Sequence, residues 1–366
     1  MHQRVTERSV DAAAKEPLLG NEKRSWQSKM PHEIDQNQER TPGDFPSPSW
    51  TLAKSNNGGQ TMPQTIAHRG YKAKHPENTL KAFRGAVDVG AHAIETDIHL
   101  SKDNVVVLSH DGDLKRCFGQ KQKIIDCDWQ YLSSLRTLRE PHEPMPRLLD
   151  LLQYLAQPGL EHIWLLLDIK IDNNADDVMR LIAKTLASVD PGIRPWKERV
   201  VLGIWVAKYL PLCTKYAPGY PISHIGFSTL YARQFLKVPN VSFNMLQKVM
   251  FGPLGARFLR DVQKAHRPLY LWTVNDVNLM KWSIQKHVDG VITDDPKTFR
   301  KICEEWDDEK EPPAKLSWSQ LLYTCWLYVL IMFFVIPFRR RFPETVGQFI
   351  KARDLQAKAS SSVGQL

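Results

Sequence analysis

The chain has 366 residues, of which 42% are hydrophobic, 24% charged and 10% aromatic, a composition that excludes a wholly disordered chain, a collagen-like repeat and a multi-span transporter. The net charge of +9 forms no dominant basic stripe with interleaved aromatic residues, so we expect no nucleic-acid partner. The five cysteines contain no CxxC pair, which argues against a disulfide framework or a zinc ribbon and favours a reducing, intracellular compartment.

Residues 1–60 are rich in Gln, Asn, Ser and Pro, and their eight Lys and Arg residues are balanced by eight Asp and Glu residues. Such a segment buries too little apolar surface to offset the entropy lost on ordering, so we predict that it is disordered. It contains no apolar stretch typical of a secretory signal. We therefore expect the folded domain to cover residues 61–303.

Within residues 61–303, short apolar runs alternate with stretches in which apolar residues recur every three or four positions. The runs predict nine strands, at 65–67, 93–98, 105–109, 163–169, 200–205, 222–227, 241–245, 269–274 and 290–293. Continuous β-branched runs are typical of strands that are buried on both faces of a parallel sheet. Helices are predicted at 79–89, 148–156, 176–189 and 254–264, with Asn78 and Asp176 as N-caps and Gly90 as a stop.

Repeated strand–helix units over this length predict an α/β fold, the (β/α)8 TIM barrel. Because nine strands exceed the eight of such a barrel, we expect one of them to be a hairpin arm or not a strand. A doubly wound open sheet is the alternative, although no GxGxxG motif follows any of the runs.

An acidic, proline-containing linker at 304–315 precedes 23 residues without charge, 316–338. This length is sufficient for a membrane segment, and its Trp and Tyr residues suit a membrane interface. A buried core helix is the alternative. The tail at 339–366 is basic, with six Lys and Arg residues against two acids. A spanning helix would hold this tail in the cytosol, whereas Pro337 and the polar start of the segment also permit a hairpin or monotopic insertion.

Charged and imidazole side chains stand at the ends of four predicted strands. They are His68, Arg69 and Glu77 after the first strand, Glu95 and Asp97 in the second, His110 after the third, and Asp168 and Lys170 at the fourth. Because barrel active sites are built at the carboxyl ends of the strands, we expect these side chains to surround one mouth.

The three acids predict a cation site. Glu95 and Asp97 lie two residues apart on one strand and share a face. With Asp168 they would form an all-oxygen site suited to Mg²⁺, Ca²⁺ or Mn²⁺ rather than zinc. The alternative is a structural salt bridge between these acids and Arg69 or Lys170.

His68 and His110 are candidates for general acid and base, because imidazole titrates near neutral pH. Arg69 offers a planar fork for phosphate oxygens, and Lys170 offers a point charge. A metal site with two cationic side chains opposite two histidines indicates phosphoryl-ester chemistry, in which charge neutralisation is most of the task.

Seven motifs together resemble the glycerophosphodiester phosphodiesterase family over roughly residues 64–303. They are HRG at 68–70, PENT at 76–79, ExD at 95–97, HD at 110–111, DIK at 168–170, WTVN at 272–275 and DGVITDDP at 289–296. Within this family, the motifs and the apolar C-terminal segment are most similar to those of the fungal phosphatidylglycerol phospholipases C.

The resemblance implies a role for each site residue. It implies a divalent ion, Mg²⁺ or Ca²⁺, at Glu95, Asp97 and Asp168, and acid–base work by the two histidines. It further implies phosphate contacts from Arg69 and Lys170, and a site ordered by Glu77. We expect Trp272 to form a wall of the pocket, with simple core packing as the alternative. Many family members have Glu where this chain has Asp168, and the shorter side chain would change metal distance or preference.

The resemblance also implies an activity and a place in the cell. We expect a metal-dependent hydrolase that cleaves phosphatidylglycerol to diacylglycerol and glycerol phosphate, bound to a membrane through residues 316–338. The alternatives are a phosphodiesterase for soluble glycerophosphodiesters such as glycerophosphocholine, and a catalytically inactive membrane-bound adaptor. The expected location is the mitochondrion, the endoplasmic reticulum or lipid droplets.

Overall fold

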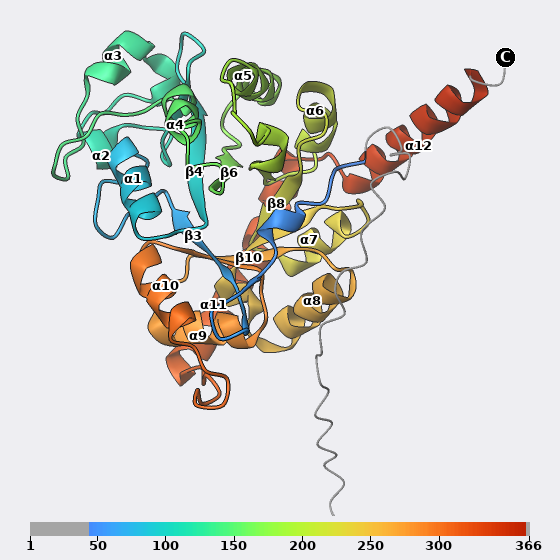
Figure 1. The fold of residues 1–366 in the computed structure, drawn as a ribbon. Coiled ribbons are helices and arrows are strands. Elements are labelled where there is room, and N and C mark those ends of the chain that lie inside the picture. Colours follow the sequence, from blue (N-terminus) through green and yellow to red (C-terminus); the bar gives the residue numbers. More distant parts are fainter. Residues whose placement is uncertain (1–43, 364–366) are drawn as a thin grey trace, which may run out of the picture. The chain divides into compact units, whose positions relative to one another are not determined.

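The computed structural model describes residues 44–363, and within them eight parallel strands close into a barrel (Figure 1). The strands are β3 (Gln64–His68), β4 (Ala93–Leu100), β6 (Trp164–Ile169), β7 (Val200–Ile204), β8 (Ile222–Gly226), β9 (Ser242–Leu246), β10 (Leu269–Trp272) and β11 (Gly290–Thr293). Strand β3 pairs with both β11 and β4, which closes the sheet. The predicted TIM barrel is thereby confirmed, and the alternative of an open sheet is wrong.

The ninth predicted strand is a hairpin arm. Strand β5 (Val106–Leu108) pairs antiparallel with the end of β4, with Ile98 opposite Leu108. The segment that follows β5 has its own small apolar core and contains α2 (Lys115–Phe118), the 3-10 turn Ile124–Asp126 and α3 (Trp129–Ser134). This segment contains the side chains that directly follow β5, at the mouth of the barrel.

Eight helices lie around the barrel strands (Figure 1). They are α1 (Leu80–Asp88), α4 (Leu148–Leu155), α5 (Ala175–Ala187), α6 (Tyr209–Tyr216), α7 (Thr229–Phe235), α8 (Gly252–Lys264), α9 (Val277–Gln285) and α10 (Pro296–Glu304). The short 3-10 turns Trp196–Glu198 and Gln247–Met250 precede β7 and α8. All four helices predicted from the sequence are present, within a few residues of their expected ends.

The two predicted N-caps are wrong, although the predicted stop is right. Thr79 caps α1 by accepting a hydrogen bond from the Ala82 amide, because the Asn78 side chain is bonded elsewhere, at the mouth of the barrel. Asn174 caps α5, and Asp176 lies in its first turn, where a negative charge still favours the helix. Gly90 follows α1 with φ +75°, a conformation that glycine adopts without strain.

The side chains that point into the barrel form an apolar layer and, at the carboxyl ends of the strands, a polar layer. Two-residue alternation along each strand decides which residues point inward. On β6, Trp164 and Leu166 belong to a small apolar cluster that also contains Ile66 and Tyr270 from other strands, whereas Leu165, Leu167 and Ile169 belong to the larger core cluster. The same alternation on β6 brings Asp168 to the carboxyl end on the face of Trp164 and Leu166. The apolar layer thus fills the barrel below the predicted site.

Residues 44–60 correct the predicted disordered segment. They contain the 3-10 turn Ser49–Thr51 and β1 (Lys54–Ser55), which pairs with β2 (Thr61–Met62). The Gln64 side-chain amide donates to the carbonyl oxygens of Trp50 and Leu52, and Phe45 is only 4% exposed. Aromatic and backbone contacts with the barrel therefore order this part, which average composition conceals. The rest of the prediction, for residues 1–43, lies outside the described residues.

The predicted membrane segment forms most of α11 (Trp318–Arg341). Its stretch Trp318–Phe338, with a mean hydropathy of 2.2, is long and apolar enough to cross a membrane. One face contacts the barrel, where the Tyr328 hydroxyl donates to the Val249 carbonyl oxygen at 2.6 Å. The rest of its surface exposes large apolar side chains, namely Trp318, Leu322, Tyr323, Trp326, Val329, Met332, Phe333, Phe334 and Ile336. The helix is therefore neither a buried core helix nor surrounded by protein.

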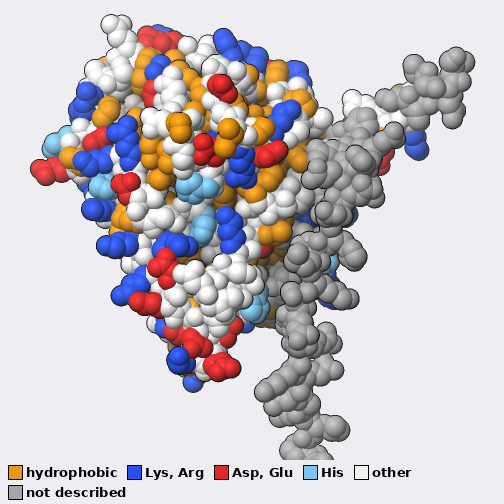
Figure 2. All heavy atoms as spheres, viewed as in Figure 1, with side chains coloured by type: hydrophobic (Ala, Val, Ile, Leu, Met, Phe, Trp, Pro, Cys, Tyr) orange, Lys and Arg blue, Asp and Glu red, His pale blue; other side chains and the backbone are white. Residues whose placement is uncertain are grey.

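Helix α12 (Val346–Val363) follows, and its Arg353 forms an ion pair with Asp44 at 2.9 Å. On the face shown in Figure 2, Lys and Arg side chains are interspersed with acidic and hydrophobic ones rather than gathered in one stripe.

Candidate active site

Three buried carboxylates meet at the carboxyl end of the barrel. Strand register places Asp97 of β4 beside Asp168 of β6, and Glu95 lies two residues earlier on β4. One oxygen from each of the three lies within 4.8 Å of the others. The three residues are 6% exposed or less. The predicted cluster is thus assembled by adjacent strands, whose alternation points all three groups inward.

Two cationic side chains contact this cluster. The Lys170 ammonium lies 2.7 Å from Asp97 Oδ1 and 2.5 Å from Asp168 Oδ2. Arg69 Nε lies 3.2 Å from Asp97 Oδ2, and its Nη1 lies 2.8 Å from Glu77. The salt-bridge alternative is therefore observed, and it uses the same residues as the candidate cation site.

The electrostatic balance leaves Glu95 as the least compensated carboxylate. Burial alone would raise the pKa of Asp97, but Lys170 and Arg69 lower it well below its usual range. Burial, together with Asp97 and Asp168, raises the pKa of Glu95 well above its usual range. The backbone amide of Arg69 donates to Glu95 Oε2 at 3.0 Å. A hard divalent cation would supply the missing positive charge, so this all-oxygen donor set fits Mg²⁺ or Ca²⁺.

His68 is oriented by a carboxylate from the opposite end of the domain sequence. Its Nδ1 lies 2.5 Å from Asp294 Oδ1, and Asp294 also accepts hydrogen bonds from Asn275 at 2.9 Å and Lys72 at 3.3 Å. Burial lowers the pKa of His68, an effect that Asp294 partly opposes. Burial would raise the pKa of Asp294, but its bond to His68 brings it to about 2. The ionised carboxylate assigns the proton to Nδ1, so Nε2 is the atom that can exchange a proton.

His110 has the same arrangement in a more open setting. Its Nδ1 lies 2.8 Å from Asp111 Oδ1, and its side chain is 37% exposed. Arg116 donates to Asp111 and, through both terminal nitrogens, to Glu77. Burial would raise the pKa of Glu77, but Arg116 and Arg69 lower it to about 2. Alternating charges therefore run from the cation cluster to His110 across the mouth.

Two tryptophans stand beside the cluster. Trp205 directly follows β7, and its indole N–H donates to Asp168 Oδ1 at 2.6 Å. Its ring meets that of Trp272 edge-on, with 5.8 Å between centroids. The Trp272 N–H donates to the Asn244 carbonyl oxygen at 3.0 Å. Trp272 therefore lies one ring away from the carboxylates, and its role as a pocket wall stays a prediction.

The structure brings all nine predicted site residues to this end of the barrel. They are His68, Arg69, Glu77, Glu95, Asp97, His110, Asp168, Lys170 and Trp272. Sequence reasoning assigned no role to Asp294, Asp111, Arg116 or Trp205. Asp294 and Trp205 each directly follow a barrel strand, a position that is itself a signal for the active-site end.

Known proteins are similar to this chain in sequence. The sequence profile of the glycerophosphoryl diester phosphodiesterase family matches residues 68–298. A lysophospholipase D from Rattus norvegicus is 44% identical over 286 residues, which cover 65% of this chain and 85% of that protein. The human lysophospholipase D is 40% identical over 292 residues, covering 68% of this chain and 89% of that protein.

Solved structures show the same fold. A phosphodiesterase from Oleispira antarctica, solved in complex with the product sn-glycerol-3-phosphate, matches with a TM-score of 0.58 at 21% identity over 66% of this chain and 96% of that one. A glycerophosphodiester phosphodiesterase from Thermotoga maritima matches with a TM-score of 0.52 at 26% identity over 66% and 98% of the two chains. With its profile match spanning more than half of the chain, this protein belongs to the glycerophosphoryl diester phosphodiesterase family, a family of metal-dependent phosphodiester hydrolases.

Proposed function

We propose that this protein cleaves phosphatidylglycerol to diacylglycerol and glycerol phosphate at a membrane surface, by phospholipase C chemistry. The observation that carries the proposal is the position of α11. This helix packs on the barrel that holds the candidate site while the rest of its surface exposes nine large apolar side chains. An enzyme for soluble diesters has little use for such a surface, whereas a lipid hydrolase needs contact with the bilayer.

The head group of phosphatidylglycerol suits the two histidines. Its glycerol hydroxyl next to the phosphoester attacks phosphorus, and well-oriented intramolecular attack contributes up to ~7–11 kcal/mol. One imidazole Nε2 takes the hydroxyl proton, and the other donates a proton to the departing diacylglycerol oxygen. Water then opens the cyclic phosphate to glycerol phosphate, with the two imidazoles exchanging roles. His68 and His110 both have an Nδ1 held by a carboxylate, which prepares each for this transfer.

The remaining side chains neutralise charge. Arg69 and Lys170 lie where they can contact the oxygens of a phosphate, and Glu77 holds Arg69 in place. A divalent cation at Glu95, Asp97 and Asp168 would supply further positive charge to the phosphate when bound. Membrane association is proposed to occur through residues 316–338, in the mitochondrion, the endoplasmic reticulum or lipid droplets.

The relatives named lysophospholipase D favour a second candidate function, the hydrolysis of lysophospholipids. A lysophospholipid has a free glycerol hydroxyl beside its phosphoester, so the same attack would expel the head-group alcohol instead of the lipid. Phosphatidylcholine offers a hydroxyl on neither side and should be a poor substrate in both cases.

The test is cleavage by the purified full-length protein in detergent micelles, with phosphatidylglycerol, lysophosphatidylcholine, phosphatidylcholine and glycerophosphocholine as substrates. Each is incubated with Mg²⁺, Ca²⁺ or chelator, and His68→Ala serves as the inactive control. Metal-dependent release of diacylglycerol from phosphatidylglycerol supports the proposal. Faster turnover of lysophosphatidylcholine selects the second candidate, and turnover of glycerophosphocholine alone assigns the site to soluble diesters. Equal cleavage of phosphatidylcholine contradicts the hydroxyl mechanism. If no substrate is turned over and no metal is bound, the protein is an inactive adaptor.

A further inference from the structure

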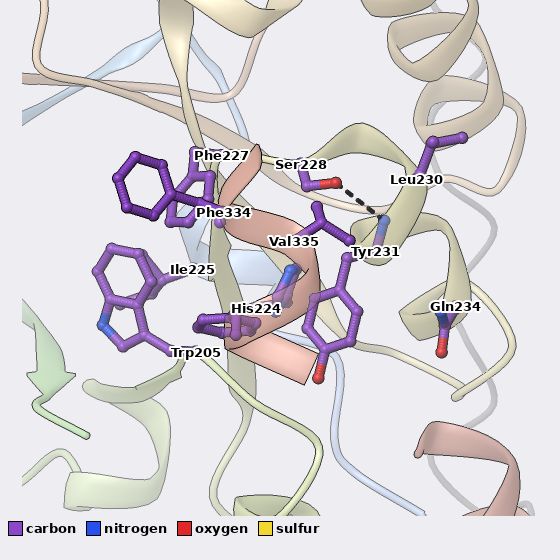
Figure 3. Close-up of a pocket in the computed structure, with 12 residues that line it drawn as sticks. Trp205, His224, Ile225, Phe227, Ser228, Leu230, Tyr231, Gln234, Phe334 and Val335 are labelled. Atoms are coloured by element: carbon purple, nitrogen blue, oxygen red, sulfur yellow. Dashed lines mark hydrogen bonds between the residues drawn. The ribbon is translucent and has the colours of Figure 1, made fainter. Parts of the chain in front are cut away.

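A cavity of about 170 Å³, outside the candidate active site, lies between the barrel and α11 (Figure 3). The barrel contributes His224 in the middle of β8, and Phe227 and Tyr231 from the turn and helix that follow. Helix α11 contributes Phe334, Val335 and Phe338. The Phe338 ring meets those of Phe227 and Tyr231 edge-on, at 6.4 and 6.2 Å. The apolar C-terminal helix is therefore a wall of this cavity.

Trp205 joins the cavity to the candidate active site. Its ring lines the cavity and lies 6.3 Å from that of Phe227. The same side chain donates its N–H to Asp168, a carboxylate of the cation cluster, and its ring centroid lies 5.9 Å from the Lys170 ammonium. One indole thus contacts both the apolar cavity and the phosphate-binding candidates.

The cavity offers no charge to a ligand. Among the described residues that line it there is no Lys, Arg, Asp or Glu. His224 is fully buried and stacks on Phe235 with 4.0 Å between ring centroids, and burial lowers its pKa to about 3, so it is neutral at physiological pH. A charged ligand would lose its hydration here without any compensating charge, which is unfavourable. An apolar ligand carries no such cost.

The rim of the cavity continues into the exposed face of α11. Phe334 lines the cavity and is 62% exposed, and its neighbours Met332 and Phe333 are each 74% exposed. Leu230, on the barrel side, is 71% exposed. An apolar path therefore runs from the outer surface of the helix to Trp205. Engineered apolar cavities of ~150 Å³ stay dry and bind benzene, so the space here accepts several methylene groups of a chain.

We propose that this cavity receives an acyl chain of the lipid substrate and so delivers the phosphodiester to the cation cluster, which Trp205 also contacts. The inference rests on the proposed function only in taking the substrate to be an acylated phosphodiester. It names a specificity element of this chain, because α11 provides three of the twelve lining residues. A substrate drawn part-way from the bilayer would place its polar head and its tail against the same side chain.

The test fills the cavity from α11 and compares it with a matched change outside it. Val335→Trp places an indole in the cavity, and Val329→Trp makes the same change on the exposed face of the same helix. For each purified full-length variant, kcat/KM is measured for phosphatidylglycerol with long acyl chains and for glycerophosphoglycerol, which has none. The expected result is that the ratio of the two constants falls about tenfold in Val335→Trp and stays within about twofold in Val329→Trp. Equal ratios in the two variants overturn the proposal.

A second measurement does not depend on turnover. A glycerophospholipid carrying a diazirine in its acyl chain is photolysed with each protein in nanodiscs, and labelled peptides are identified by mass spectrometry. Label is expected on the barrel peptide that contains Phe227 and Tyr231, and it should be lost in Val335→Trp but kept in Val329→Trp. If phosphatidylglycerol is not cleaved but this labelling pattern appears, the proposed function fails while the acyl site stands. Label confined to α11 contradicts the acyl site.

Discussion

Two buried regions of this protein share Trp205 and treat ionisable groups in opposite ways. In the cation cluster, Asp97 and Lys170 are both buried, and each shifts the pKa of the other toward its charged form. In the apolar cavity, His224 is just as buried but is held neutral. The difference lies in the neighbours, because a buried charge persists only where an opposite charge or several hydrogen bonds compensate it.

This contrast corresponds to the two ends of a glycerophospholipid. A phosphodiester needs the compensated charges of the first region, and an acyl chain needs the uncharged walls of the second. Substitutions that remove one component of either region at a time test this correspondence, and the largest expected effect comes first.

Removal of a carboxylate from the cation cluster has the largest expected effect. Glu95→Gln keeps the shape of the side chain but removes the charge, so divalent-cation binding should be lost and kcat should fall by about 10⁴-fold or more on every substrate. Isothermal titration calorimetry with Mg²⁺ and Ca²⁺ measures the binding directly. Glu140→Gln, at a carboxylate that is 88% exposed, is the matched control. If the Glu95→Gln variant still binds the cation, Glu95 is not one of its ligands.

Loss of either histidine should affect the chemical step more than binding. His68→Ala and His110→Ala are each expected to lower kcat by about 10²–10⁴-fold, the usual contribution of general acid–base catalysis. The double variant should be little worse than either single one, because the two groups act as a unit. His142→Ala, at a histidine that is 55% exposed, is the control. A loss below tenfold at either position would assign that histidine to another role.

Asp294 is expected to act as a positioning residue for His68. Asp294→Asn removes the negative charge from His68 Nδ1, so kcat should fall by about 10–100-fold, as for other carboxylates that orient a histidine. Because Asp294 raises the pKa of His68, its loss should move the limb of the pH–rate profile that reports His68 to lower pH. The kcat, KM and pH profile of the variant are measured together. A profile that does not move would reduce Asp294 to a structural role.

Much of the fold and site is local in sequence and was therefore predictable. All nine apolar runs are strands, because strands buried on both faces carry continuous apolar residues. The cluster residues stand at strand ends within short motifs, so barrel topology brings them together.

The parts that could not be predicted depend on contacts between distant residues. Asp294 meets His68 across 226 positions, and Trp205 meets Asp168 across 37. Residues 44–60 are ordered by the barrel they contact, which their composition cannot show. The face of α11 that packs on the barrel is equally hidden, since apolar residues surround this helix on all sides and give no pattern to select one face.

The smallest expected effect concerns the neutral state of His224 and appears in stability rather than activity. With a pKa of about 3 in the folded protein and 6.5 when unfolded, His224 binds a proton on unfolding between these values, so its contribution to stability is lost as pH falls below 6.5. His224→Phe retains a ring to stack on Phe235 but cannot be protonated. From pH 7 to pH 5, its unfolding free energy should therefore decrease by about 2 kcal/mol less than that of the unchanged protein.

Urea denaturation of both proteins at the two pH values measures this difference, with His162→Phe, at an exposed histidine, as the control for the same substitution outside the cavity. An unchanged pH dependence in His224→Phe would mean that His224 gains a proton as easily in the folded protein as in the unfolded one. Water or a counter-charge would then reach the ring, and the cavity would no longer contrast with the cation cluster. A weaker pH dependence, confined to this variant, shows that the wall of the cavity excludes charge, which is the property that an acyl chain requires of it.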